Sequence, residues 1–431
     1  MRLPFLDRDE ETARLARLVE SREGSLGVLY GRRRCGKSRL LREILPPERS
    51  IYYVGDEREG ALQRTSLAAE IARLLPGFDR VTYPDWDSLF ARFWREADPR
   101  TALVLDELPA LVAEARELPS VLQKHIEPLF GRAREILKIA PLRAGWIQRA
   151  LHLDDPVQAV EAYAVWGGIP RYWELAGDHP DLATAVRSLV LSPLGVLYEE
   201  PSRLLLDDLR DTAQATSILA LIGQGCHRIS EIAARMGKPA TSLARPLERL
   251  MEMDLVAREM PFGTSVRSSK RTLYRIADPF LRFWFRFVQP DRSRLEARQT
   301  AAVERDIAAR FPHHAGEAWE ELARESVPVL DYFGRTWGPA SRWWGPGLDR
   351  QPLEIDLVAE SQGRDAFLIG EVKWASPDDP ARLLQELERK VARLPFIEGR
   401  EVFMALWLKA PVRGPLRRQV MPPEQVLAGL R

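Results

Sequence analysis

The chain has 431 residues, of which 63 are Lys or Arg and 62 are Asp or Glu, so its formal net charge is only +1. This length predicts roughly two to four domains, and the near-neutral total leaves any preference for nucleic acid to local charge. The two cysteines exclude a disulfide framework, no Cys or His cluster has zinc-site spacing, and no apolar run reaches membrane-spanning length. We therefore expect a cytoplasmic protein that does not enter a membrane.

A complete phosphate-binding motif comes first along the chain. The sequence from 31 to 38 matches G-x-x-x-x-G-K-[ST] between the apolar run 26–30 and a helical pattern over 39–44, which is the strand-loop-helix context that the motif requires. Backbone N–H groups and the helix N-terminus favour a polyphosphate, Lys37 can reach its β and γ phosphates, and Ser38 can ligate Mg²⁺. A plain strand-to-helix turn is the alternative. The residues expected to contact ATP are Gly31, Arg32, Arg33, Arg34, Cys35, Gly36, Lys37 and Ser38.

Two acids follow a second apolar run. Thr101 to Leu105 has the pattern of a buried strand and ends at Asp106 and Glu107. Asp106 is expected to hold Mg²⁺, and Glu107 to polarise the attacking water. Acids after a strand are also commonly solvated loop residues, so this interpretation depends on the phosphate-binding motif.

Strand and helix patterns alternate up to about residue 142, which predicts an α/β fold with a parallel sheet covered by helices. The strand candidates are 26–30, 50–54, 101–105 and 135–139. From about 143 to 200 the pattern is helical, broken by Gly and Pro between 167 and 170. This break is either a plain helix-helix turn or a functional element.

Residues 206–288 have the pattern of a winged helix, with three helices followed by a two-stranded hairpin. The hairpin segment carries five basic residues against the single acid Glu259, which suits phosphate contacts, although protein docking or a structural role is the alternative. Pro246 falls inside the expected third helix, where it is expected to remove a backbone hydrogen bond and bend the helix. The residues expected to contact DNA are Arg245, Arg249, Arg267, Lys270 and Arg271.

The last unit, 296–431, contains two strand candidates, 354–358 and 367–373, joined by a loop of about ten residues around Gly363. Asp356 lies on the first strand and Glu371 and Lys373 on one face of the second, since side chains alternate along a strand. The two acids suit Mg²⁺ against a scissile phosphate, with Lys373 orienting the nucleophilic water. Glu320, on an expected helix, is a further acid. Solvated surface charges are the alternative.

Together these motifs resemble the archaeal-type ATPases of the STAND branch of AAA+ proteins, and the resemblance covers nearly the whole chain. It implies a P-loop ATPase core over 1–142, a helical lid over 143–205, a winged helix over 206–288 and a C-terminal α/β restriction-endonuclease-like domain over 296–431. It also implies that the N-terminal element Phe5, Arg8 and Glu11 lies near the adenine, and that the lid touches the base through Gly168 and Pro170.

The C-terminal acids and lysine are similar to the D…E-x-K core of PD-(D/E)xK nucleases, and Glu320 matches the helix acid often found there. One departure concerns the ATPase core. Related ATPases carry a further central strand that ends in a polar sensor residue, whereas 108–134 shows helical or loop patterns only. We infer that this strand is deleted, so that the sheet must close by direct pairing or rearrange.

Two functions remain open. The chain is either an ATP-regulated enzyme that cuts DNA with Mg²⁺, or a nucleotide-dependent switch that binds DNA or protein without cleavage. Retention of both acids and the lysine favours the first, and loss of the sensor strand favours the second. The sequence does not identify an oligomeric state.

Overall fold

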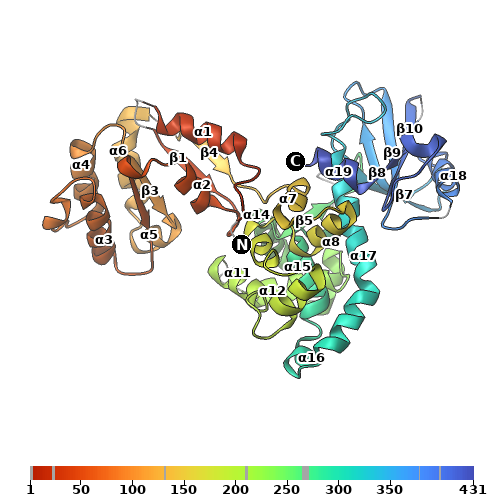
Figure 1. Cartoon of the computed structure of the whole chain (residues 1–431), viewed down its shortest axis with the longest axis horizontal. Coiled ribbons are helices and arrows are strands. Elements are labelled where there is room, and N and C mark those ends of the chain that lie inside the picture. Colours follow the sequence, from red (N-terminus) through yellow and green to blue (C-terminus); the bar gives the residue numbers. More distant parts are fainter. Residues whose placement is uncertain are drawn as a thin grey trace. The chain divides into compact units, whose positions relative to one another are not determined.

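The computed structural model describes residues 3–21, 25–130, 133–208, 212–264, 271–377, 379–397 and 399–431. The chain divides into two compact units (Figure 1). The smaller unit is Arg8–Ala140, and the larger one combines the segment up to Asp7 with Pro141–Arg431. Within the described ranges, every helix is too short or too polar to cross a membrane.

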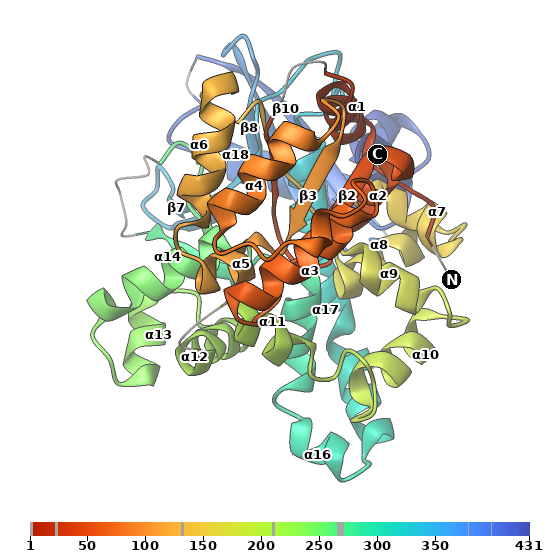
Figure 2. The same cartoon turned by 90° about the vertical axis from the view of Figure 1, so that its left-hand side faces the viewer.

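The smaller unit alternates helices and parallel strands, as its sequence pattern predicts. Its elements are α1 (Asp9–Val19), β1 (Gly27–Tyr30), α2 (Lys37–Ile44), β2 (Ser50–Val54), α3 (Gly60–Ala72), α4 (Trp86–Glu96), β3 (Ala102–Asp106), α5 (Leu108–Glu114), α6 (Leu118–Phe130) and β4 (Glu135–Lys138). Helices α3 and α4 pack on β2 and β3, as Figure 2 shows. Phe90 and Phe93 of α4 are fully buried in this core, because the apolar face of an amphipathic helix is removed from water there.

The four strands form two separate parallel pairs. Strand β1 pairs with β4, and β2 pairs with β3. Between β3 and β4 the described residues form only α5 and α6, in agreement with the inferred loss of the sensor strand. The expected single sheet is therefore not formed, because β1 and β3 do not pair directly in the described chain. Without a central strand Val28 and Tyr30 of β1 stay 39% and 49% exposed.

The larger unit begins with short helices. These are α7 (Ile147–Leu151), α8 (Pro156–Trp166), α9 (Pro170–Ala176), α10 (Leu182–Val186) and α11 (Glu200–Asp208). The expected break separates α8 from α9. Gly167 has φ 57°, and a Cβ on Gly168 would lie 2.1 Å from the carbonyl oxygen of Leu142, so this turn requires glycine at both positions.

Three helices and an antiparallel hairpin follow, as the sequence pattern predicts. They are α12 (Thr212–Gly223), α13 (Ile229–Met236), α14 (Ala244–Glu252), β5 (Val256–Glu259) and β6 (Leu273–Ile276). The expectation for Pro246 is wrong. Helix α14 starts at Ala244, so Pro246 lies in its first turn, where backbone N–H groups have no partner within the helix and proline is tolerated.

The segment after the hairpin is helical, with α15 (Pro279–Phe283), α16 (Arg292–Glu296) and α17 (Thr300–Ser326). The C-terminal sheet has the order β11-β10-β9-β8-β7 and is mixed. The strands of this sheet are β7 (Ser341–Pro346), β8 (Pro352–Glu360), β9 (Ala366–Lys373), β10 (Glu401–Leu408) and β11 (Val420–Met421). Helix α18 (Pro380–Val391) lies between β9 and β10 in the chain, and α19 (Pro423–Gly429) follows β11. The expected loop of about ten residues is wrong, because β8 continues to Glu360 and β9 begins at Ala366.

Helices cover both faces of this sheet. Leu406 and Leu408 of β10 join the apolar cluster that includes Leu384 and Leu387 of α18. The side chain between them, Trp407, packs instead against Tyr332, which follows α17, with ring centroids 5.6 Å apart. Since residues alternate between faces, α17 and α18 lie on opposite sides, and the sheet between them is buried.

Candidate functional sites

The backbone of the phosphate-binding loop depends on glycine. Gly31 has φ 134°, and a Cβ there would meet the carbonyl oxygen of Ile139 at 2.4 Å. Gly36 has φ 93° and directly precedes α2, whose first residue is Lys37. Cys35 is fully buried, so its thiol packs inside the loop. The predicted sequence of strand, loop and helix is confirmed.

Lys37 lies over this loop. Its ammonium donates hydrogen bonds to the carbonyl oxygens of Gly31 at 2.8 Å and Arg32 at 3.1 Å. Arg8 is buried and donates to the carbonyl oxygen of Cys35 at 3.1 Å, and it forms an ion pair with Glu11 at 3.2 Å. The N-terminal helix therefore helps to hold the loop backbone in place.

Asp106 and Ser38 are brought together, as expected for a magnesium site. Ser38 Oγ donates to Asp106 Oδ2 at 2.7 Å, and the Tyr52 hydroxyl donates to the same oxygen at 2.5 Å. Burial raises the pKa of Asp106, but the hydrogen bonds from Tyr52 and Ser38 outweigh it and hold the pKa below its ordinary value. Burial, together with the Asp106 carboxylate, raises the pKa of Tyr52 to about 12. Asp106 is thus ionised and Tyr52 neutral near pH 7.

Glu107 has an unusual backbone. Its φ is 52°, in the left-handed region that non-glycine residues rarely adopt, and it precedes the first residue of α5. Its carboxylate lies 3.9 Å from the guanidinium of Arg33 in the loop, with both side chains about half exposed. The proposed water-polarising acid therefore faces the loop, within reach of one of its arginines.

Phe5, Gly168 and Pro170 belong to the larger unit, whereas the loop belongs to the smaller one. Their predicted contact with the adenine stays a prediction.

Asp356, Glu371 and Lys373 converge in the C-terminal sheet. The Lys373 ammonium lies 3.2 Å from Asp356 Oδ2 and 2.7 Å from Glu371 Oε1. Both acids are buried, since Asp356 is 9% exposed and Glu371 is 7% exposed. Asp356 Oδ2 also accepts a hydrogen bond from the backbone N–H of Val372 at 3.0 Å. Two acids on neighbouring strands thus share one lysine.

A second lysine, missed by the sequence analysis, contacts the same cluster. Lys390 of α18 lies 2.7 Å from Glu371 Oε2, so each oxygen of this carboxylate has its own ammonium partner. Burial lowers the pKa of Lys373, but the carboxylates of Asp356 and Glu371 outweigh it and raise the pKa above its ordinary value. Two negative and two positive charges therefore balance locally.

Glu320 of α17 lies beside this cluster without joining it as a third metal ligand, because the described residues contain no group of three or more His, Cys, Asp or Glu that could hold a metal. Burial and the nearby Asp356 carboxylate raise the pKa of Glu320 to about 7. Arg324 connects the two, at 3.5 Å from Glu320 Oε2 and 3.0 Å from the carbonyl oxygen of Asp356. The charge of the Glu320 carboxyl is therefore expected to change near neutral pH.

Two family models match parts of the chain. Residues 5–140 match an ATPase domain predominantly from archaea. Residues 284–390 match a family described as archaeal and bacterial proteins of unknown function. The first match confirms a P-loop ATPase domain, a family that binds nucleotide and usually uses Mg²⁺. Ser38 and Asp106 fit such an ion, since they bring a hydroxyl and an ionised carboxylate together.

Individual proteins show low sequence identity to this chain. An uncharacterized protein of Methanocaldococcus jannaschii is 25% identical over 445 residues, which covers 93% of this chain and 95% of that protein. The Walker-type ATPase of Pyrococcus abyssi is 20% identical with a TM-score of 0.45, over 65% of this chain and 96% of its own. The ORC1 protein of Aeropyrum pernix, solved in complex with DNA, is 16% identical with a TM-score of 0.33, over 68% of this chain and 95% of its own. The ATPase assignment depends on the family match.

The hairpin differs from the basic wing that the sequence suggested. Arg275 forms an ion pair with Glu321 of α17, and burial lowers its pKa. Glu259 pairs with Arg342 of β7 at 3.2 Å, and Arg342 accepts a hydrogen bond at its carbonyl oxygen from the Phe262 N–H at 2.8 Å. The expectation of one acid among five basic residues is therefore wrong for the folded chain, because α17 supplies a second acid.

The residues expected to contact DNA have different positions. Arg245 and Arg249 are exposed and lie one turn apart on α14, so they share a face of the helix. Arg271 is exposed at the start of the second hairpin arm. Arg267 and Lys270 lie outside the described residues.

Proposed function

We propose that the chain is an ATP-regulated enzyme that acts on DNA. The smaller unit binds Mg-ATP, and the cluster of Asp356, Glu371 and Lys373 hydrolyses a phosphodiester bond with Mg²⁺. The proposal includes the domain division drawn from the sequence, with a core, a lid, a winged helix and a restriction-endonuclease-like C-terminal domain.

One observation carries the nuclease part of this proposal. The carboxylates of Asp356 and Glu371, which are only 9% and 7% exposed, share the ammonium of Lys373 at 3.2 and 2.7 Å. Charged side chains on a sheet normally point to solvent, and burying them costs free energy unless they are paired. Two buried acids on neighbouring strands that share one partly exposed lysine form an arrangement that a solvated sheet surface does not need.

The donor set suits Mg²⁺, which proteins often hold through one or two carboxylates, with water and substrate phosphate completing the shell. Asp356 and Glu371 are those carboxylates, and the ion would supply charge neutralisation at the phosphate and a more acidic water. Lys373 would orient the water. The oxygen of this water forms a bond to phosphorus, and the bond between phosphorus and the leaving sugar oxygen breaks. The water loses a proton, and the leaving sugar oxygen gains one.

DNA contact is proposed through α14, where Arg245 and Arg249 are exposed on one face. Arg267, Lys270 and Arg271, which lie between β5 and β6 in the sequence, are proposed as further phosphate contacts. Changing Arg245 and Arg249 together to Ala should reduce the salt slope of duplex binding by about 0.9 for each phosphate that is no longer neutralised. An unchanged slope, measured by anisotropy between low and moderate salt, would place the DNA surface elsewhere.

A second function is favoured by two observations. The described part of the ATPase domain has no sensor strand, and Glu371 is held by two lysines rather than one. Both suit a non-cleaving nucleotide-dependent switch that binds DNA or protein, with weak hydrolysis of ATP.

Metal-dependent cleavage of a supercoiled plasmid separates the two functions. The full chain is incubated with plasmid and Mg²⁺ or Mn²⁺, with ATP, ADP or no nucleotide, and with chelator as the control. Nicked or linear product that requires metal supports the enzyme. Intact plasmid under every condition, from protein that binds ATP, supports the switch.

A further inference from the structure

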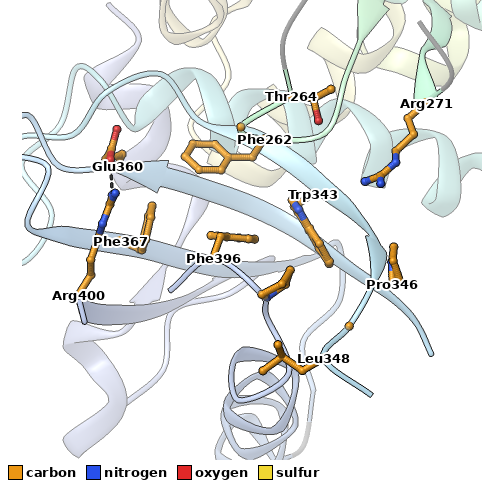
Figure 3. A pocket seen from close by; sticks show the side chains of 13 residues that line it. Phe262, Thr264, Arg271, Trp343, Pro346, Leu348, Glu360, Phe367, Phe396 and Arg400 are labelled. Carbon is orange, nitrogen blue, oxygen red and sulfur yellow. Dashed lines mark hydrogen bonds and ion pairs between the residues drawn. The ribbon is translucent and has the colours of Figure 1, made fainter. Parts of the chain in front are cut away.

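A pocket of about 760 Å³ lies between the described hairpin residues 262–264 and 271 and the C-terminal sheet (Figure 3). Its most distinctive lining is aromatic and consists of Phe262, Trp343, Phe367 and Phe396. Phe262 comes from the hairpin and the other three from the C-terminal unit. The volume falls within the range of pockets that hold a small organic ligand.

The aromatic rings form a connected wall. Phe396 lies 5.8 Å from Phe262, 5.5 Å from Trp343 and 5.5 Å from Phe367, measured between ring centroids. Phe262 and Phe396 are only partly buried, so parts of their rings remain accessible. Such rings offer apolar faces to a planar ligand.

The two ends of the pocket differ in charge. At one end Arg400 lies over the Phe367 ring and pairs with Glu360, so its charge is already balanced. At the other end Arg271 is exposed, and no described residue forms an ion pair or hydrogen bond with it. Figure 3 shows its guanidinium turned toward Trp343 and Pro346. The pocket therefore has one net positive end.

Gly345 leaves the space that this guanidinium uses. A Cβ on Gly345 would meet Arg271 Nη1 at 3.1 Å and the Trp343 ring at 3.4 Å. The lack of a side chain at this position allows Arg271 to lie beside the aromatic wall. Accessible aromatic faces next to one uncompensated guanidinium match a ligand that is planar at one end and anionic at the other.

We propose that this pocket binds an unpaired nucleotide, with the base stacked on Phe262 and Phe396 and the phosphate held by Arg271. The nucleotide belongs either to single-stranded DNA or to a free mononucleotide. The assignment of the nucleotide to single-stranded DNA rests on the proposed action of the chain on DNA. Phe367, which lines the pocket, lies four residues before Glu371 on β9, roughly 13 Å at about 3.3 Å per residue, so the pocket and the acids share one strand of the sheet.

The test is the affinity of the full chain for a fluorescein-labelled oligothymidylate, measured by anisotropy in chelator so that no metal-dependent cleavage occurs. Arg271→Ala should weaken binding about tenfold and reduce the salt slope by about 0.7, the value for one phosphate contact to a single strand. Phe396→Leu should weaken binding about tenfold with an unchanged salt slope, because it removes a stacking face and no charge. Phe262→Leu, on the hairpin side of the pocket, serves the same purpose if Phe396→Leu fails to fold.

Arg417→Ala is the matched control, because Arg417 is exposed next to β11, at the edge of the sheet opposite β7. Its binding should equal that of the unchanged chain. Competition by dTMP at micromolar concentration identifies a free nucleotide as the ligand, whereas oligothymidylate binding without such competition identifies the strand. Because binding is measured in chelator, a chain that lacks metal-dependent cleavage can still bind oligothymidylate, so that failure of the nuclease proposal and failure of the pocket proposal are distinguishable. If both pocket variants bind both probes as the unchanged chain does, or if neither probe binds, the proposal is overturned.

Discussion

The phosphate-binding loop and the C-terminal cluster both combine acids with a lysine, but they partner their acids differently. In the loop, neutral hydroxyls of Ser38 and Tyr52 hold Asp106, while Lys37 bonds to backbone carbonyl oxygens. In the C-terminal cluster, ammonium groups hold the acids directly. A cation that binds Asp106 therefore competes with neutral hydroxyls, which can remain as ligands of that cation. A cation that binds Glu371 must instead displace a positively charged ammonium group. The two sites are thus expected to respond differently to substitution.

The largest expected effect is at Asp356. Asp356→Asn keeps the size of the side chain and removes its charge, so metal-dependent DNA cleavage should fall by more than about a hundredfold. ATP affinity should be unchanged, because the two sites lie in different units. Asp331→Asn, an exposed aspartate of the larger unit, is the control. Full cleavage by Asp356→Asn would remove the nuclease proposal.

The next effect concerns ATP. Lys37→Ala removes the ammonium that neutralises the β and γ phosphates, and ATP affinity measured by calorimetry should fall on the order of thirtyfold. Lys124→Ala changes an exposed lysine of the same unit and should have no effect. A folded Lys37→Ala chain that binds ATP normally would show that the nucleotide binds elsewhere.

A third prediction uses the raised pKa of Glu320, about 7 in the folded chain against an ordinary value of 4.5. Between these values the folded chain holds a proton that the unfolded chain has lost, so stability should fall as pH rises from about 4.5 to 7. In Glu320→Gln the free energy of unfolding should fall by about 1 to 3 kcal/mol less over this pH range, because one pKa unit corresponds to about 1.4 kcal/mol.

The measurement is the urea-induced unfolding transition of the larger unit, recorded at about pH 5 and pH 8 without metal. Glu388→Gln, at an exposed position on α18, should keep the pH dependence of the unchanged chain. An identical pH dependence for Glu320→Gln would mean that the Glu320 carboxyl is ionised across this range.

The smallest effect tests the second lysine. Lys390→Gln removes one of the two cations that compete with a metal for Glu371, so Mn²⁺ affinity should rise about threefold. Arg389→Gln, its exposed neighbour on α18, is the control, and calorimetry is the measurement. Weaker Mn²⁺ binding by Lys390→Gln would indicate that the lysine positions Glu371 for the metal instead of competing with it.

Local patterns in the sequence predicted much of the local structure. The phosphate-binding motif, the strands before Asp106 and around Asp356, and the shared face of Glu371 and Lys373 follow from spacing within a few residues. Such features depend on backbone periodicity and on the conformations open to glycine, which neighbouring residues determine.

Contacts between distant segments could not be predicted in this way. Lys390 meets Glu371 only because α18 packs over β9, and Tyr52 meets Asp106 only because β2 pairs with β3. The ion pair between Arg275 and Glu321 and the separation of the ATPase strands into two pairs likewise depend on packing. No periodicity encodes which helix lies over which strand.

The sequence by itself thus determined which residues carry phosphate and carboxylate chemistry and on which element each one lies. Only the tertiary structure decided how these groups are charged and partnered. The physical reason is that the charge state of a buried acid depends on burial and on groups within a few ångströms. Those groups come from parts of the chain that are far apart in sequence.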